Sequence, residues 1–147
     1  MTRQDGERRE ATVRLVDEFE ANDRVAAVFA DIRTTKGIDR VPNLWRALAT
    51  SPDLLEATWS RLKAVMHPEA LGKTSRLDPL AREMIALAVS ATNGCAYCVN
   101  SHTAALRKLG LDHSGLAEVM AVVALFNTTN ALADGYQVAP DVFPPLD

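Results

Sequence analysis

Apolar residues recur at helical spacing along almost the whole chain. A first set stands at positions i, i+3, i+4 and i+7 and comprises Val25, Val28, Phe29 and Ile32. This spacing predicts the inner face of a helical region over about residues 9–34, with Asn22-Asp23 as a candidate interruption. Helical spacing continues after Pro42 and again after Pro52. No segment alternates convincingly as a strand would, so the pattern predicts an all-α fold.

A pair of helices joined by a tight turn is predicted in the middle of the chain. Asp78-Pro79 marks the start of the first helix, over about residues 79–92, since aspartate caps helices well and proline fits the first helical position. This helix is apolar almost all round, which is typical of a buried helix. Asn93-Gly94 ends it, and a second helix follows from about Cys95 to Leu109. The two form a predicted helical hairpin.

The C-terminal part combines a long apolar helix with a tail that contains prolines. The helix is predicted over about residues 114–133, with four buried candidates: Met120, Val123, Leu125 and Leu132. The tail cannot be helical because of its prolines, but it is apolar enough to pack on a surface. We therefore expect an N-terminal helical extension (1–40), a single helical domain (41–134) and a C-terminal apolar tail (135–147). This amount of apolar surface predicts a homo-oligomer.

Composition narrows the possible partners and compartment. The chain has 147 residues, a net charge of −3 and 48% hydrophobic residues, which suits a globular domain and argues against nucleic acid as a partner. No stretch looks close to the ~20 apolar residues of a membrane span. The first ten residues are charged and lead into no apolar signal segment. We expect a cytoplasmic protein that binds no membrane.

The candidate chemistry is concentrated in the second helix of the hairpin. Cys95 and Cys98 are the only two cysteines of the chain, and His102 follows one turn after Cys98. At about 100° per residue the three side chains lie on or beside one stripe. The opposite side carries polar residues, namely Asn100, Thr103 and Arg107. The start of a helix also stabilises a thiolate, because unpaired N–H groups and the positive end of the helix dipole lie there.

Glu83 adds a carboxylate to this group. It stands in the apolar first helix of the hairpin, twelve positions before Cys95, and reaches the thiols only if the two helices pack together. Thiols, imidazole and carboxylate support redox chemistry, and they also bind zinc. A zinc site would use Cys95, Cys98 and His102, with Glu83 as a fourth ligand. A third alternative makes both cysteines small core residues, and the residues alone leave all three open.

These four residues form the pattern E-x11-C-x2-C-x3-H, which resembles the alkylhydroperoxidase D-like branch of the carboxymuconolactone decarboxylase superfamily. The resemblance covers about residues 41–112 and includes three longer runs: Val41 to Leu48, Ser51 to Leu55, and Arg82 to Cys98. It implies an all-helical fold whose hairpin carries the CxxC site, assembled as trimers or hexamers. It also implies reduction of organic hydroperoxides, with Cys98 as the peroxidatic thiol, Cys95 as the resolving thiol, and Glu83 and His102 as a proton relay.

The resemblance also sets the expected partners. An external dithiol or thiol protein must reduce the disulfide, and no cofactor or metal is expected at the site. Relatives without cysteines decarboxylate a lactone, a reaction that the intact pair argues against. Tyr97 stands where the best-studied members carry a histidine, which removes one near-neutral proton shuttle. The alternatives are a thiol-disulfide oxidoreductase with little peroxidase activity, and a non-catalytic helical module that binds metal or senses redox state.

Overall fold

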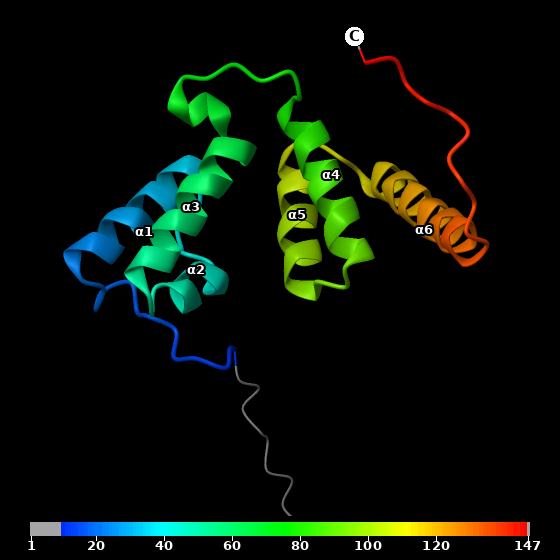
Figure 1. The fold of residues 1–147 in the computed structure, drawn as a ribbon. Helices are drawn as coiled ribbons and strands as arrows, with labels where there is room; N and C mark the ends of the chain where they lie inside the picture. Colours follow the sequence, from blue (N-terminus) through cyan, green and yellow to red (C-terminus); the bar gives the residue numbers. More distant parts are fainter. Residues whose placement is uncertain (1–9, 147) are drawn as a thin grey trace, which may run out of the picture. The chain divides into compact units, whose positions relative to one another are not determined.

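The computed structural model describes residues 10–146, and these residues form helices without any strand. In chain order the helices are α1 (Asp23–Lys36), α2 (Asn43–Leu48), α3 (Pro52–Met66), the short 3-10 helix η1 (Pro68–Leu71), α4 (Pro79–Thr92), α5 (Ala96–Lys108) and α6 (His113–Gly135) (Figure 1). The predicted all-α fold is confirmed. The chain divides into two compact units, an N-terminal unit (Met1–Ser75) and a C-terminal unit (Arg76–Asp147).

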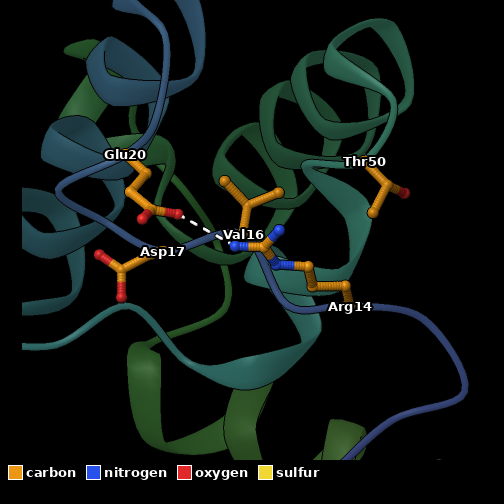
Figure 2. A pocket seen from close by; sticks show the side chains of 5 residues that line it. All are labelled: Arg14, Val16, Asp17, Glu20 and Thr50. Atoms are coloured by element: carbon orange, nitrogen blue, oxygen red, sulfur yellow. Dashed lines mark hydrogen bonds and ion pairs between the residues drawn. The ribbon is translucent and has the colours of Figure 1, made fainter.

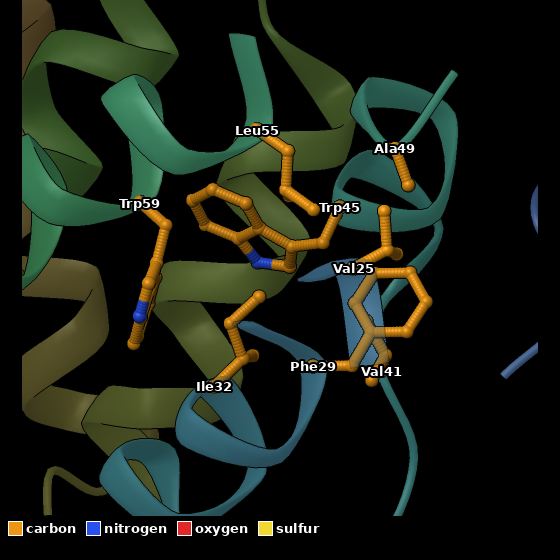
Figure 3. Packing of buried hydrophobic residues seen from close by; sticks show 8 residues of the cluster. All are labelled: Val25, Phe29, Ile32, Val41, Trp45, Ala49, Leu55 and Trp59. Carbon is orange, nitrogen blue, oxygen red and sulfur yellow. The ribbon is translucent and has the colours of Figure 1, made fainter. Parts of the chain in front are cut away.

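The N-terminal unit has its own buried core. Eight residues from α1, α2, α3 and the connecting segments make it up: Val25, Phe29, Ile32, Val41, Trp45, Ala49, Leu55 and Trp59 (Figure 3). The rings of Trp45 and Trp59 meet edge to face, with centroids 5.2 Å apart and planes at 82°. This geometry suits the quadrupoles of aromatic rings. The helical spacing of α1 therefore predicts its buried face correctly.

Polar contacts join α1 to α3 around that core. Arg24 of α1 donates hydrogen bonds to Asp53 and Glu56 of α3, both at 2.6 Å. Asp31 of α1 accepts hydrogen bonds from the Trp59 indole N–H at 2.6 Å and from Lys63 at 2.7 Å. The indole thus has a polar partner while its ring is buried, which spares the desolvation cost of an unpaired N–H.

The segment before α1 differs from the prediction. The expected helix over residues 9–34 begins only at Asp23, where the Asn22 side chain caps it by accepting from the Val25 N–H at 3.0 Å. Residues 10–22 are not helical. Instead of forming helical hydrogen bonds, the backbone of Val16 in this segment hydrogen-bonds to Arg46. Val16 N donates to the Arg46 carbonyl at 3.1 Å, and the Val16 carbonyl accepts from Arg46 Nε at 3.0 Å.

This N-terminal segment belongs to the same unit as α1 to α3. Glu18 accepts a hydrogen bond from Val41 N at 2.8 Å and pairs with Arg33 of α1. Figure 2 shows a surface hollow beside it, where Arg14 pairs with Glu20 at 3.2 Å and Thr50 forms part of the rim. These contacts all lie within the N-terminal unit, which ends at Ser75. The charged residues 1–9, read above as lacking a secretory signal, lie outside the described residues.

The C-terminal unit contains the predicted hairpin. Asp78 caps α4 by accepting from Ala81 N at 2.7 Å. Gly94 then takes a φ of 71°, a left-handed conformation that glycine adopts without strain, and α5 returns alongside α4. Leu87 of α4 and Leu106 of α5 are fully buried. The helical hairpin is confirmed.

The long helix α6 departs from the prediction in its burial. None of its 23 residues is buried, and Leu125 and Leu132, expected in the core, are more than half exposed. Helix α4 was also predicted to be buried all round, but the side chains of Ile85 and Val89 are exposed. By length and composition α6 is also long and apolar enough to cross a bilayer, so the expectation that no stretch approaches the length of an apolar membrane span is wrong. Buried helices of soluble proteins pass the same test.

The tail after α6 has no regular secondary structure as far as residue 146. Four of its apolar side chains are exposed: Val138, Val142, Phe143 and Leu146. The prediction of a non-helical apolar tail is confirmed for the described residues.

Candidate functional site

The two cysteines sit at the start of α5 and are joined to each other. Cys95 is the N-cap residue and Cys98 lies in the first turn, with a Cα–Cα distance of 5.3 Å and a disulfide between them. Cys98 N donates a hydrogen bond to Cys95 Sγ at 3.2 Å. Both residues are half-buried. The disulfide therefore closes within the first turn of α5, and the Cys98 N–H points to the sulfur of Cys95, where it would stabilise a thiolate.

The hairpin brings Glu83 to His102. Glu83 Oε2 of α4 lies 2.7 Å from His102 Nδ1 of α5. Their side chains are only 12% and 24% exposed, so the pair is shielded from most solvent. When the carboxylate is ionised, Nδ1 carries the proton and donates it to Oε2, which leaves Nε2 as a proton acceptor. The pair is thus an oriented imidazole next to a carboxylate.

Local structure explains how Glu83 reaches His102 and why His102 lies on the side of α5 that carries Cys98. Glu83 lies on the face of α4 that also carries the buried Leu87 and Ser90. His102 stands four residues after Cys98 on α5, so both side chains lie on the same side of the helix. The Gly94 turn sets α5 against that face of α4. Glu83 therefore meets His102, which lies one helical turn after Cys98 within the C-terminal unit.

Two neighbours complete the description of the site. Tyr97, which stands between the cysteines, is 42% exposed. Arg82, next to Glu83, is only 7% exposed, and sequence reasoning did not single it out. The sequence does contain a signal for Arg82, because a charged residue stands there inside an otherwise apolar helix and arginine is rarely buried.

The donors considered for zinc are arranged in two separate pairs. Cys95 and Cys98 share a disulfide, and Glu83 contacts His102. Among residues 10–146, no group of three or more His, Cys, Asp or Glu side chains is placed to hold a metal ion. The observed arrangement is a disulfide-bonded cysteine pair, followed one helical turn later by a histidine that contacts a carboxylate.

Comparison with known proteins matches this chain to one protein family and to one crystal structure. The profile of the carboxymuconolactone decarboxylase family matches residues 52–141. The crystal structure of the alkylhydroperoxidase AhpD core from Rhodospirillum rubrum is 48% identical, with a TM-score of 0.82, and the match covers 90% of this chain and 95% of that chain.

Two curated relatives are more distant. Alkyl hydroperoxide reductase AhpD from Solibacter usitatus is 30% identical over 105 residues, which are 71% of this chain and 54% of the relative. The protein of the same name from Streptomyces avermitilis is 29% identical over 85 residues, which are 58% of this chain and 48% of the relative. The chain therefore spans about half the length of these curated relatives.

Proposed function

This chain belongs to the carboxymuconolactone decarboxylase family, and we propose that within it the chain is a thiol-dependent peroxidase that reduces organic hydroperoxides. The observation that carries the proposal is the contact of 2.7 Å between Glu83 and His102, with His102 one helical turn after Cys98 of the Cys95–Cys98 pair. An oriented imidazole next to a thiol pair is what peroxide reduction requires, because a proton must leave the thiol and reach the alcohol. The relatives named alkyl hydroperoxide reductase support the same chemistry.

The first step oxidises Cys98. Nε2 of His102 takes the thiol proton, and the Cys98 thiolate attacks the terminal oxygen of the hydroperoxide. A sulfur–oxygen bond forms while the oxygen–oxygen bond breaks, and the alkoxide leaves as an alcohol with the proton that His102 returns. Cys98 becomes a sulfenic acid, the first oxidised form of a cysteine thiolate.

The second step closes the disulfide. The Cys95 sulfur attacks the sulfur of the Cys98 sulfenic acid, so that the sulfur–sulfur bond forms and the sulfur–oxygen bond breaks. The departing hydroxide combines with the proton of the Cys95 thiol to give water. The backbone N–H of Cys98 stabilises Cys95 as a thiolate, which is the form that attacks. An external dithiol or thiol protein then reduces the disulfide.

Glu83 acts in this proposal by orienting and charging His102. Its carboxylate fixes the Nδ1–H tautomer and stabilises the imidazolium that forms when His102 takes the proton. Tyr97 replaces a histidine of the best-studied members, so the relay consists of Glu83 and His102 alone. We propose that the protein works in the cytoplasm as a homo-oligomer, a trimer or hexamer in the family, where thiol donors keep the pair reduced.

The proposal is tested by mixing reduced protein with one equivalent of cumene hydroperoxide in a stopped-flow instrument, followed by thiol counting. Wild type is expected to lose two thiols and form the Cys95–Cys98 disulfide. Cys98→Ser is expected to consume no peroxide. Cys95→Ser is expected to turn over once and to retain a sulfenic acid on Cys98, which dimedone captures.

Two results would change the assignment. Peroxide consumption that Cys95→Ser abolishes and Cys98→Ser preserves would exchange the roles of the two cysteines. Wild type that exchanges disulfides with a dithiol protein but leaves the hydroperoxide intact would be a thiol-disulfide oxidoreductase.

A further inference from the structure

Cys95 is held by hydrogen bonds at its backbone N–H, its carbonyl and its sulfur. The N–H donates to the Ser90 carbonyl of α4 at 3.0 Å, and the carbonyl accepts from Val99 N of α5 at 2.9 Å. The sulfur accepts from Cys98 N at 3.2 Å, which is the bond that an N-cap side chain makes. The end of one helix and the start of the next therefore fix this residue on both sides.

The capping bond also determines where the sulfur of Cys95 lies. An N-cap side chain that accepts from the N–H three residues later lies over the first turn of its helix. Cys98 stands in that turn, and residues three apart on a helix are neighbours. The donor is a backbone group that is present whether the two sulfurs are bonded or not. We therefore expect the same cap in the reduced protein, where it holds the Cys95 thiol next to Cys98.

The backbone at the start of α5 has the spacing that a disulfide needs. Cα atoms more than about 7 Å apart cannot be bridged unless the backbone moves. The Cα atoms of Cys95 and Cys98 are 5.3 Å apart, and α5 is helical from Ala96 onward while the bond is closed. The folded hairpin thus accommodates the disulfide without unwinding of the helix.

We propose that this arrangement protects Cys98 from over-oxidation, so that an excess of hydroperoxide does not inactivate the protein. The protection rests on the proposed function, because it concerns the sulfenic acid that the first hydroperoxide leaves on Cys98. Two reactions compete for this group, and only one of them can be reversed by a thiol donor.

The first reaction closes the disulfide, when the Cys95 thiolate attacks the sulfur of the sulfenic acid and hydroxide leaves. The second consumes another hydroperoxide. The sulfur attacks its terminal oxygen, a second sulfur–oxygen bond forms, the oxygen–oxygen bond breaks and an alcohol leaves. Sulfur loses two electrons, the hydroperoxide gains them, and the product is a sulfinic acid, which thiols do not reduce.

The effective concentration of Cys95 decides between the two reactions. A partner group on a short flexible linker already has an effective concentration in the millimolar range. Well-oriented groups reach about 10⁵ M or more. Since hydrogen bonds orient both the backbone and the sulfur of Cys95, its effective concentration is expected to lie far above the millimolar range. A hydroperoxide at millimolar concentration or below then loses the competition.

A double variant separates the position of the second thiol from its mere presence. Cys95→Ser keeps the cap, because serine is a preferred N-cap residue. Ala96→Cys in the same chain restores a second thiol at an exposed position of α5. Residues two apart on a helix do not face each other, so this shifted pair has both thiols without their alignment. Circular dichroism verifies that the shifted pair keeps the wild-type helix content.

Equilibration with glutathione redox buffers measures the alignment without any hydroperoxide. The equilibrium constant for disulfide formation, obtained by thiol counting, is the effective concentration of the two thiols toward each other. Wild type is expected to exceed the shifted pair by about 100-fold or more, because orientation dominates effective concentration. Equal constants would overturn the role of the cap.

Over-oxidation is measured by treating the reduced protein with millimolar cumene hydroperoxide and then with dithiothreitol. Wild type is expected to recover both thiols and to gain no oxygen. Cys95→Ser and the shifted pair are each expected to lose the Cys98 thiol and to gain the mass of two oxygen atoms. Chymotrypsin places the gain on Cys98, because Tyr97 separates it from the other cysteine.

The possible contrary results differ in what they refute. A sulfinic acid in wild type would overturn the protection, while the consumption of hydroperoxide would still support the proposed function. A shifted pair as resistant as wild type would show that any second thiol suffices, and the cap would lose its role. Wild type that leaves the hydroperoxide intact would refute the proposed function and the protection with it, whereas the glutathione equilibrium would still decide whether the cap aligns the thiols.

Discussion

Two phenylalanines illustrate the difference between the two units. Phe29 in α1 is 1% exposed and packs in a core that the N-terminal unit completes by itself. Phe126 in α6 is 56% exposed although its helix is more apolar than α1. Residue type alone therefore does not decide burial. A unit buries its apolar side chains only where its own helices supply opposing faces.

The difference also concerns the site. The candidate catalytic residues all lie in the C-terminal unit, whose helices are only partly covered, while both tryptophans lie in the N-terminal unit. Tryptophan fluorescence therefore reports the folding of the N-terminal unit, which does not contain the site. Stability and activity are expected to respond to different sets of residues.

The largest expected effect is on the stability of the N-terminal unit. Phe29→Ala removes a fully buried ring from the core and is expected to lower its free energy of unfolding by about 3–5 kcal/mol. Phe126→Ala removes the same atoms from an exposed position and is expected to leave that unfolding transition unchanged. Urea titrations followed by tryptophan fluorescence compare the two. Equal shifts in both variants would mean that the two units do not differ as described.

Next in size is the effect of the proposed relay. Glu83→Gln and His102→Gln are each expected to slow the oxidation of the thiols by about 100-fold, because an oriented base contributes a factor of at least about 10². His67→Gln, in the N-terminal unit, is the control and is expected to keep the wild-type rate. Stopped-flow rates measured across pH provide the comparison. If both relay variants oxidise their thiols at the wild-type rate, the start of α5 alone activates the thiolate.

A smaller effect is expected at the turn that positions Cys95. Gly94 has a φ of 71° and nothing within 4 Å of an added Cβ, so Gly94→Ala meets only backbone strain. The left-handed conformation is expected to cost about 1–2 kcal/mol of stability. Gly135→Ala, at the end of α6 without a positive φ, is the matched control and is expected to be neutral or slightly stabilising. Thermal unfolding followed by circular dichroism at 222 nm measures both, and equal melting temperatures would contradict the role of the turn.

The smallest expected effect is a pH dependence confined to the N-terminal unit. Burial opposes ionisation of Asp31, but the hydrogen bonds from Lys63 and Trp59 together outweigh it and lower the pKa of Asp31 below its ordinary value. A carboxylate with a lowered pKa stabilises the fold above its unfolded-state pKa of about 3.9 and loses that contribution as the pH falls through the folded-state value.

Acid titration monitored by tryptophan fluorescence measures this contribution. Asp31→Asn is expected to be less stable than wild type at pH 7, with the difference shrinking below about pH 4. A difference that stays constant from pH 7 to pH 3 would show that the charge of Asp31 does not contribute.

Features that depend on neighbours in the chain could be predicted from the sequence. The N-cap at Asp78, the turn at Gly94 and the placement of both cysteines with His102 on one side of α5 follow from capping, glycine conformation and helical spacing. Each depends on residues within about one turn, so no other part of the fold is needed to determine them.

Tertiary structure decided the rest. The contact between Glu83 and His102 joins residues 19 positions apart and exists because two helices pack. The segment 10–22 stays out of the helix because its backbone hydrogen-bonds to Arg46, 30 residues away. Burial of α6 was wrongly predicted because its apolar sequence specifies that it needs a partner, not that its own chain supplies one. Local interactions fix where helices begin and end, but only the packing of distant segments decides which faces are covered and which side chains meet.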